Sequence, residues 1–365
     1  MAFDLQPTDE QRVLKDTLRD FSHEVVRPAA RAAEEAGSVP DDLRGQIHEL
    51  GVTAPVNEEG LSAGPPLDAV TYVIAAEELA WGDPGIAYAT FGAGLGAVAV
   101  GIAGSDDQRA KYLPAFLEAI PPSAFVAVGE RVAAGDLEAL ETSVDGAKAV
   151  GHKYGVVAAD AASFGVAVGR DQRGLAAVLF EGSDDYEIVK REQKLGLEAA
   201  PTYVVRFDGA GEPMASGPEL QRAILWAKLL VGAIAVGSAR ASFEYASRYA
   251  IEREAFGKPI GAFQGVSFKI ADMAIAVDAA RLSVWRAAWK IDRGDATLAD
   301  VAEANGHALS AAVLCGDDGV QILGGHGYIR DHPVEKWFRD AVTLSVFDSP
   351  ELTGDVMTGR SVFAG

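Results

Sequence analysis

Two stretches in the second half of the chain decide the fold. Residues 253–264 read REAFGKPIGAFQ, and residues 321–328 read QILGGHGY, followed by WFRDA at 337–341. The first stretch lies between two long segments of helical periodicity, so spacing alone predicts a turn between two helices, with Gly257 as the helix stop and Pro259 after it. The glycines of the second stretch allow backbone N–H groups to approach a ligand closely.

Outward from these stretches, the chain divides into three parts. Helical periodicity extends from about residue 8 to 118, short runs rich in Val, Phe and Tyr fill about 123–214, and long helical segments follow from about 217. We therefore predict an α+β fold with an N-terminal helical domain (1–120), a small central β-barrel or sandwich domain (121–214) and a C-terminal four-helix bundle (215–365).

The individual helices are predicted from the spacing of apolar residues and from their start and stop signals. In the first part, Thr8 or Asp9 is an N-cap candidate, and helices are predicted over 70–80, 86–102 and 106–119. In the last part, the pattern predicts helices from about 218 to 252, 263 to 291 and 298 to 323, with shorter ones near 333–345 and 351–362.

Composition restricts the classes of ligand. The 365 residues include 32 Lys and Arg against 53 Asp and Glu, giving a net charge of −21. Such a chain is repelled by phosphate backbones and anionic lipid, so we expect no nucleic-acid and no membrane partner. An anionic ligand would need a local basic group or backbone N–H donors.

Cysteine and histidine usage excludes several kinds of site. A single cysteine, Cys315, excludes an internal disulfide and a cysteine-based zinc site, and the histidines show no metal-ligand spacing. The apolar stretches 91–104 and 229–237 are shorter than the ~20 residues that span a bilayer. Because the N-terminus has no secretory pattern, we expect a cytoplasmic protein. Because the histidines and the cysteine show no metal-ligand spacing, we expect it to bind no metal.

Taken together, the R-x-x-F-G-x-P-I-x-x-F-Q, Q-I-L-G-G-x-G-Y and W-F-R-D-A segments resemble the acyl-CoA dehydrogenase family. The likeness covers nearly the whole chain and includes AEELA at 76–80 and KYLP at 111–114. It implies a tetrameric FAD enzyme that oxidises an acyl-CoA between Cα and Cβ. A carboxylate would remove the α-proton while hydride leaves Cβ for the flavin, and the electrons would pass to an electron-transferring flavoprotein.

The resemblance implies a composite flavin site. One subunit holds the isoalloxazine ring and the base, and its neighbour reaches over to the pyrophosphate and adenine. Arg253 would meet the pyrophosphate, while Ala255 stands where the family usually has a small polar residue. The resemblance also implies that Phe256, Phe263 and Gln264 lie at the subunit interface of the cofactor site. The remaining cofactor-binding residues that it implies are Gln321, Gly324 and Gly325, and Gln321 and Gly325 would meet the adenine end.

The half of the flavin site that holds the isoalloxazine ring, called the ring-holding half, departs from the family pattern. The family's T-E-P-x-A-G-S-D segment corresponds to GERVAAGD at 129–136, which keeps Glu130 but lacks the hydroxyls. The family's W-I-T strand corresponds to GVV at 155–157, so a ring that packs on the flavin and a nearby hydroxyl are both missing. Loss of the stacking alone costs about 0.5–1.5 kcal/mol beyond area burial.

The catalytic base implied by the resemblance is also altered. Asp348 takes the position of the family's glutamate, and Pro350 takes that of a threonine. Aspartate is shorter by one methylene, about 1.5 Å, and a misplacement of that size lowers a rate on the order of 100-fold. The family's alternative base position corresponds to Ala227, with Lys228 beside it.

Three functional hypotheses follow. In the first, the chain is the partner subunit of a hetero-oligomer and completes the FAD site of a homologous catalytic sister chain. In the second, it is a self-sufficient homotetrameric enzyme with Asp348 as base. In the third, it is a non-catalytic binding or scaffold protein. The first is favoured because the departures from the family are concentrated in the ring-holding half.

Overall fold

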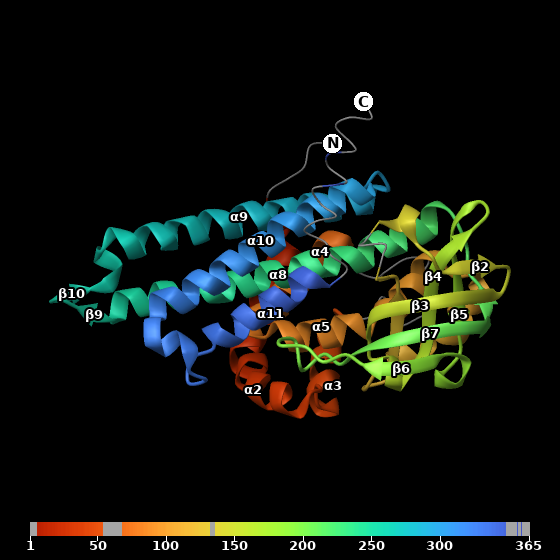
Figure 1. The fold of residues 1–365 in the computed structure, drawn as a ribbon, viewed down its shortest axis with the longest axis horizontal. Helices are drawn as coiled ribbons and strands as arrows, with labels where there is room; N and C mark the ends of the chain where they lie inside the picture. The colour runs from red at the N-terminus through yellow and green to blue at the C-terminus, as the bar shows by residue number, and fades with distance from the viewer. Residues whose placement is uncertain (1–5, 54–67, 132–135, 348–355, 357–358, 360–365) are drawn as a thin grey trace.

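The computed structural model describes residues 6–53, 68–131 and 136–347, together with 356 and 359. Helices precede and follow a central β-sheet, which confirms the predicted α+β fold class. In Figure 1 the sheet lies at one end of an elongated molecule and the long helices extend away from it. The predicted helix at 351–362 and the proposed base Asp348 lie outside the described residues.

The first part of the chain is helical up to Tyr112. Thr8 caps the first helix in a capping box with Gln11, as the start signal predicts. Gly37 ends the second helix in the left-handed conformation, at φ +66°. The helices of this part are α1 (Asp9–Phe21), a π-helical turn (Ser22–Val26), α2 (Arg27–Ala36), α3 (Asp41–Glu49), α4 (Ala69–Gly82), α5 (Pro84–Gly92), α6 (Leu95–Ala103) and α7 (Asp106–Tyr112).

The central part is one curved sheet with strand order β6-β7-β3-β2-β4-β5-β8, and β1 pairs in parallel with β4. Aromatic side chains fill its own core, where Phe125, Phe180, Tyr186 and Phe207 pack against one another. The strands are β1 (Ser123–Ala127), β2 (Ser143–Asp145), β3 (Lys148–Val157), β4 (Ala162–Asp171), β5 (Gly174–Phe180), β6 (Glu187–Arg191), β7 (Thr202–Ala210) and β8 (Glu212–Pro213).

The last part is a bundle of α8 (Pro218–Glu252), α9 (Gln264–Arg293), α10 (Leu298–Leu323) and α11 (Val334–Val346). Helix α8 packs against α4, α9, α10 and α11. Among the described residues α8 is long and apolar enough to cross a membrane, and the bent α5–α6 pair would be a second candidate if counted as one span. Since 83% of the apolar window of α8 is buried inside the molecule, we interpret α8 as a core helix.

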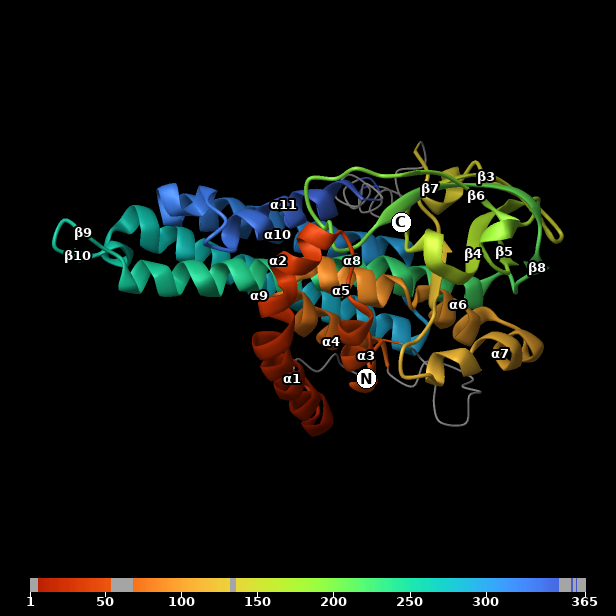
Figure 2. The same cartoon turned by 90° about the horizontal axis from the view of Figure 1, so that it is seen from below.

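Between α8 and α9 the chain forms a small hairpin, β9 (Glu254–Ala255) and β10 (Lys258–Pro259). Figures 1 and 2 both show this hairpin at the end of the molecule opposite the sheet. Helix α8 runs from one end to the other, and the 3-10 turn Gly324–Tyr328 follows α10 at the hairpin end.

Three predicted elements differ in detail. The predicted helix over 86–102 breaks at Ala93 and Gly94, where α5 ends and α6 begins. Only glycine fits at residue 94, because an added Cβ would lie 2.3 Å from the Thr53 carbonyl oxygen. The predicted helix over 106–119 ends at Tyr112 and continues as a 3-10 turn from Pro114. Gly257 is not a helix stop, because α8 ends at Glu252 and Gly257 belongs to the hairpin turn.

Candidate functional site: two half-sites at opposite ends of the chain

A cavity of about 310 Å³ lies between the sheet and the helices. Its walls come from α5, α6, β1, β3, α8 and the end of α11, and it contains the positions at which the resemblance places the flavin ring. Those positions are Gly129, Glu130, Arg131 and Gly155, and the cavity is also lined by Ala227, the family's alternative base position, with Lys228 beside it. Because these residues come from distant parts of the sequence, their meeting at one cavity supports the alignment on which the resemblance depends.

Side-chain chemistry at this cavity differs from what the family resemblance implies. Among the described lining residues there is no serine, threonine or tryptophan. Gly155 has φ +67° beside an irregularity in the β3–β7 pairing, and the Phe347 ring lies 3.8 Å from where its Cβ would be. Phe347 stacks on Tyr88 with ring centroids 5.8 Å apart. Aromatic side chains at the cavity therefore come from α5 (Tyr88), the end of α11 (Phe347) and Tyr154 of β3, and Phe347 rather than a β3 side chain packs at Gly155.

A buried ion pair holds Glu130 at the wall of the cavity. Lys153 Nζ lies 2.6 Å from Glu130 Oε1, and both side chains are almost fully buried. Lys153 also donates to the Val128 carbonyl at 3.0 Å, and Glu130 accepts backbone N–H bonds from Glu141 and Thr142. Burial alone would raise the pKa of Glu130, but Lys153 outweighs it and the pKa is lowered. Glu130 is thus an ionised anchor for the cavity wall.

A second acid, Glu192, contacts the same cavity from the segment after β6. Its Oε2 accepts a hydrogen bond from the Gly155 N–H at 3.1 Å. Glu192 also lines a neighbouring cavity of about 400 Å³, which Lys194 and Phe347 share. Burial lowers the pKa of Lys194 to about 8, and its Nζ donates to the Ala200 carbonyl at 2.6 Å. Sequence reasoning missed both residues, because neither belongs to a recognisable motif.

At the opposite end, the residues predicted to reach a neighbour's cofactor come together. Arg253 is the C-cap of α8, and its carbonyl accepts the Ile260 N–H at 2.8 Å, which closes the hairpin. Gln264 is the first residue of α9, and Gln321 lies in the last turn of α10. We call this group of residues the arm end. Its exposed members are Arg253, Phe256, Gln264, Gln321, Gly324 and Gly325, and its half-buried member is Phe263.

The hairpin turn holds an exposed aromatic residue in an unusual conformation. Phe256 has φ +53° and Gly257 has φ +79°, the pattern of a turn in which both central residues are left-handed. A bulky residue rarely adopts a positive φ, and Phe256 is 96% exposed. Its ring meets Phe263 edge-on at 6.2 Å. The Phe256 ring is therefore accessible to a neighbouring molecule.

Two tyrosine–histidine pairs connect the segment after α10 to the end of α8. The Tyr249 hydroxyl lies 2.9 Å from His326 Nδ1, and the Tyr245 hydroxyl lies 2.8 Å from His332 Nδ1. The two histidine rings meet at 5.4 Å. These contacts bind the turn after α10 to the last two turns of α8, which places Gly324 and Gly325 at the same end as Arg253.

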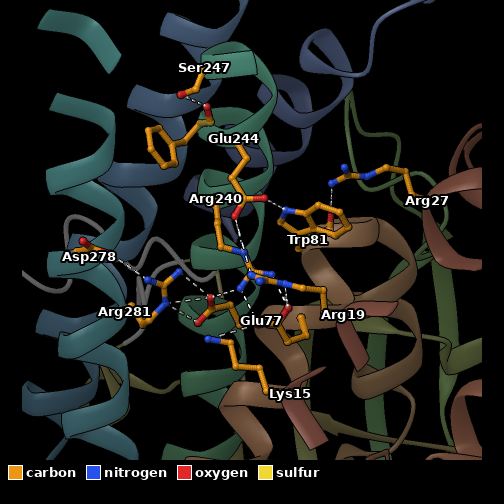
Figure 3. Close-up of polar contacts among 12 residues, drawn as sticks. Lys15, Arg19, Arg27, Glu77, Trp81, Arg240, Glu244, Ser247, Asp278 and Arg281 are labelled. Atoms are coloured by element: carbon orange, nitrogen blue, oxygen red, sulfur yellow. Dashed lines mark hydrogen bonds and ion pairs between the residues drawn. The ribbon is translucent and has the colours of Figure 1, made fainter. Parts of the chain in front are cut away.

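A buried network of charges fixes the middle of α8. Arg240 donates to Glu77 at 2.8 Å and to Glu78 at 2.6 Å, and Arg281 of α9 donates to Glu77 at 2.9 Å (Figure 3). Lys15 and Arg19 of α1 approach Glu78 from the other side. The network therefore ties α1, α4, α8 and α9 at one level, between the cavity and the arm end.

The two half-sites lie too far apart to share one cofactor within a chain. Lys228 at the cavity and Arg253 at the arm end are 25 residues apart along α8. At 1.5 Å per residue that separation is about 38 Å, longer than an extended FAD molecule. If both half-sites bind FAD, each must meet a complementary half-site from a neighbouring subunit.

Comparisons with known proteins identify the family. The chain matches the acyl-CoA dehydrogenase N-terminal domain over residues 8–119 and the acyl-CoA dehydrogenase C-terminal domain over residues 219–349. It is 33% identical over 357 residues to benzylmalonyl-CoA dehydrogenase of Aromatoleum aromaticum, covering 93% of this chain and 94% of that one.

Two solved structures share the fold over almost the full length. The structure of butyryl-CoA dehydrogenase from Megasphaera elsdenii superposes with a TM-score of 0.86 at 25% identity, covering 99% of this chain and 100% of that one. A chain from a study of the electron transferring flavoprotein of Acidaminococcus fermentans gives 0.86 at 26% identity, covering 99% of both chains. Taken with the family matches at both ends of the sequence, these likenesses show that the chain belongs to the acyl-CoA dehydrogenase family.

Proposed function

We propose that this chain is a subunit of an FAD-dependent acyl-CoA dehydrogenase and that its arm end completes the flavin site of a homologous sister chain. The reaction of the assembly is the α,β-dehydrogenation of an acyl-CoA thioester. FAD is the cofactor that the family uses, and when bound it accepts the hydride that leaves Cβ. The separation of about 38 Å along α8 directs the arm end to a neighbouring subunit. The observation that favours a sister chain as that neighbour is the lack of serine, threonine and tryptophan among the described residues that line the chain's own cavity.

The arm end fits the nucleotide tail of FAD. Arg253 presents an exposed guanidinium, which pairs with a pyrophosphate through charge-assisted hydrogen bonds. This local charge matters in a chain whose net charge is −21. Gly324, at φ +58°, and Gly325 have no neighbouring atoms where a Cβ would stand, so a ligand can approach their backbone. Gln321 supplies an amide for hydrogen bonds to adenine.

The chain's own cavity fits the ring of FAD less well. Its described lining offers no serine or threonine hydroxyl and no tryptophan ring, and Phe347 fills the space in front of Gly155. The difference between the arm end and the cavity supports a partner role for the chain. In this role the sister chain holds the flavin ring and supplies the catalytic carboxylate.

We further propose that the assembly acts on an acyl-CoA and passes its electrons to an electron-transferring flavoprotein. The names of the relatives support the thioester class, since benzylmalonyl-CoA and butyryl-CoA dehydrogenases are among them. The Acidaminococcus chain of the same fold comes from work on an electron transferring flavoprotein, which supports this class of electron acceptor. Phe256 and Phe263 would seal the apolar rim of the subunit interface around the cofactor.

Flavin content tests the proposal directly. The chain is purified alone and after co-expression with acyl-CoA dehydrogenase chains of its own organism, and the visible flavin absorbance per chain is recorded. We expect little flavin in the lone chain and stoichiometric FAD in one hetero-oligomer. Stoichiometric FAD in the lone chain overturns the partner role and favours the self-sufficient enzyme. Absence of flavin from every assembly overturns the FAD site itself.

A further inference from the structure

A half-buried lysine lines the second cavity, the one of about 400 Å³ beside the end of α11. Lys194 shares this cavity with apolar side chains, among them Leu195, Val342 and Val346. All three of these side chains are exposed, Leu195 to 79%, so the cavity is open on its outer side. A small molecule can therefore reach the lysine from solvent.

The hydrogen bonds of Lys194 suit an uncharged amine. Its Nζ donates to the Ala200 carbonyl at 2.6 Å and to the Thr202 hydroxyl oxygen at 3.3 Å. Both acceptors are uncharged, and no carboxylate in the described part of the chain forms an ion pair with Lys194, whereas the buried Lys153 and Lys336 are each paired with carboxylates. An ammonium has three N–H donors, but a neutral amine has two donors and a lone pair. Two acceptors therefore satisfy the neutral amine and leave its lone pair unused.

Burial favours the uncharged form of this amine. It lowers the pKa of Lys194 to about 8 and outweighs the neighbouring charges, of which Glu198, Glu192 and Asp340 favour the ammonium and Arg191 opposes it. At pH 8 about half of such an amine is neutral, against roughly 0.4% of an ordinary lysine with a pKa of about 10.4. A desolvated, neutral lysine is a nucleophile.

We propose that Lys194 is a site of covalent acylation by an acyl-CoA thioester. The amine lone pair attacks the thioester carbonyl carbon, a C–N bond forms, the C–S bond breaks, and the amine proton passes to the departing CoA thiolate. The products are an amide and free CoA thiol, so nothing is oxidised or reduced. The inference rests on the proposed function for one point, which is that the assembly meets acyl-CoA thioesters.

The modification would lie beside the wall that the two cavities share. Glu192, Val346 and Phe347 line both cavities, and Lys194 Nζ lies 5.9 Å from the centre of the Phe347 ring. An amide at Lys194 no longer ionises, and a short acyl chain would meet the apolar side chains of the second cavity. Acylation would therefore remove a titrating charge and add an apolar group next to Phe347.

Site-resolved acylation tests this inference. The purified chain is incubated with butyryl-CoA between about pH 7 and about pH 10, and peptide mass spectrometry measures the butyrylation rate at each lysine. At pH 8 we expect Lys194 to react at least about tenfold faster than Lys190, which is exposed on β6. Its neutral fraction is about 100-fold that of an ordinary lysine, and its lower basicity offsets part of this gain. The rate at Lys194 should level off above about pH 8.

Two substitutions at one exposed position of the cavity wall give a matched comparison. Val342→Asp adds a carboxylate to the cavity, which favours the ammonium of Lys194, and should slow its butyrylation severalfold at pH 8. Val342→Asn has nearly the same size and no charge, and should react at about the rate of the unaltered chain. Equal rates at Lys194 in the two variants contradict the inference.

The unaltered chain alone also decides the question. A rate at Lys194 no higher than that at Lys190 overturns the inference, and so does a rate that keeps rising up to about pH 10. Reaction of Lys194 with acetic anhydride but not with butyryl-CoA overturns it as well, because the cavity then excludes the thioester. Flavin absorbance of the chain and of the hetero-oligomer reports separately on the proposed function, so the two failures are distinguishable.

Discussion

The Tyr249 hydroxyl lies 2.9 Å from His326 Nδ1, although the two residues are 77 positions apart in the sequence. This contact joins the end of α8, which carries Arg253, to the turn that carries Gly324 and Gly325. The groups that we expect to hold the pyrophosphate and the adenine of FAD are therefore positioned relative to each other before any cofactor binds. A preassembled site avoids part of the ordering cost of binding.

Arg253→Gln should weaken FAD binding by the hetero-oligomer. Removing a charge-assisted contact costs about 1.5–3 kcal/mol, which corresponds to a loss of roughly 10- to 150-fold in affinity. Because Arg253 is exposed, the thermal midpoint of the flavin-free chain should stay the same. Fluorescence titration with FAD measures the affinity. Arg173→Gln, an exposed arginine in the sheet domain, is the matched control and should bind FAD normally.

Tyr249→Phe should have a smaller effect on the same titration. The substitution removes the hydroxyl that meets His326 but keeps the ring, so the turn after α10 loses one hydrogen bond and keeps its packing. We expect FAD affinity to fall about threefold to tenfold, equivalent to about 1 kcal/mol. The stability of the flavin-free chain should barely change. Normal affinity in this variant would contradict the positioning role of Tyr249.

Lys153→Met should destabilise the chain strongly. The substitution leaves the buried Glu130 without its cation, and breaking a buried pair in this way costs about 3–5 kcal/mol. The double variant Lys153→Met with Glu130→Gln should recover part of that loss, because no uncompensated charge remains. Urea unfolding followed by circular dichroism measures both. If the double variant is no more stable than the single one, the ion pair does not explain the effect.

Stability should decrease in acid because of Glu77. Burial alone would raise its pKa, but Arg281 and Arg240 outweigh burial, and the pKa of Glu77 is lowered. An acid with a lowered folded-state pKa contributes stability above the unfolded value of about 4.3, and loses it as pH falls through the folded value. Glu77→Gln should therefore be less stable at neutral pH and show a flatter acid limb in pH-dependent urea unfolding. An acid limb unchanged from that of the unaltered chain would refute this assignment.

Lys194 should make stability rise with pH in the basic range. Burial lowers its pKa to about 8, whereas an unfolded lysine titrates near 10.4. Between these values the unfolded chain binds more protons than the folded chain, so stability rises with pH. In urea unfolding at a series of basic pH values, Lys194→Met should remove this contribution to the rise. Lys190→Met, at an exposed position of β6, should retain it.

The fold was predictable because its elements carry strong local signals. The predicted bounds 298–323 are those of α10, and Thr8 caps α1 as its motif indicates. The break between α5 and α6 was not predicted, and at this break Gly94 approaches the Thr53 backbone closely across the chain. Local periodicity contains no information about such a contact.

The candidate site was predictable only in part, for a similar reason. The motifs around Arg253 and Gln321 locate the arm end, and the structure brings them together through residues that belong to no motif, such as Tyr249. The hairpin at 254–259 replaced a predicted simple turn, because Phe256 adopts a positive φ that residue preferences disfavour. Lys228 is identified in the sequence only as the residue beside the family's alternative base position, and its location at a cavity required the tertiary structure.

The central claim is that the arm end holds the nucleotide tail of a flavin whose ring is held by another chain. Photolabelling of the hetero-oligomer with FAD that carries an azide on its adenine tests this most directly, with peptide mapping by mass spectrometry. The account predicts label on residues 321–328 of this chain, and loss of that label in Arg253→Gln as FAD binding falls. Label confined to the sister chain, or found on the sheet of this chain, would contradict it.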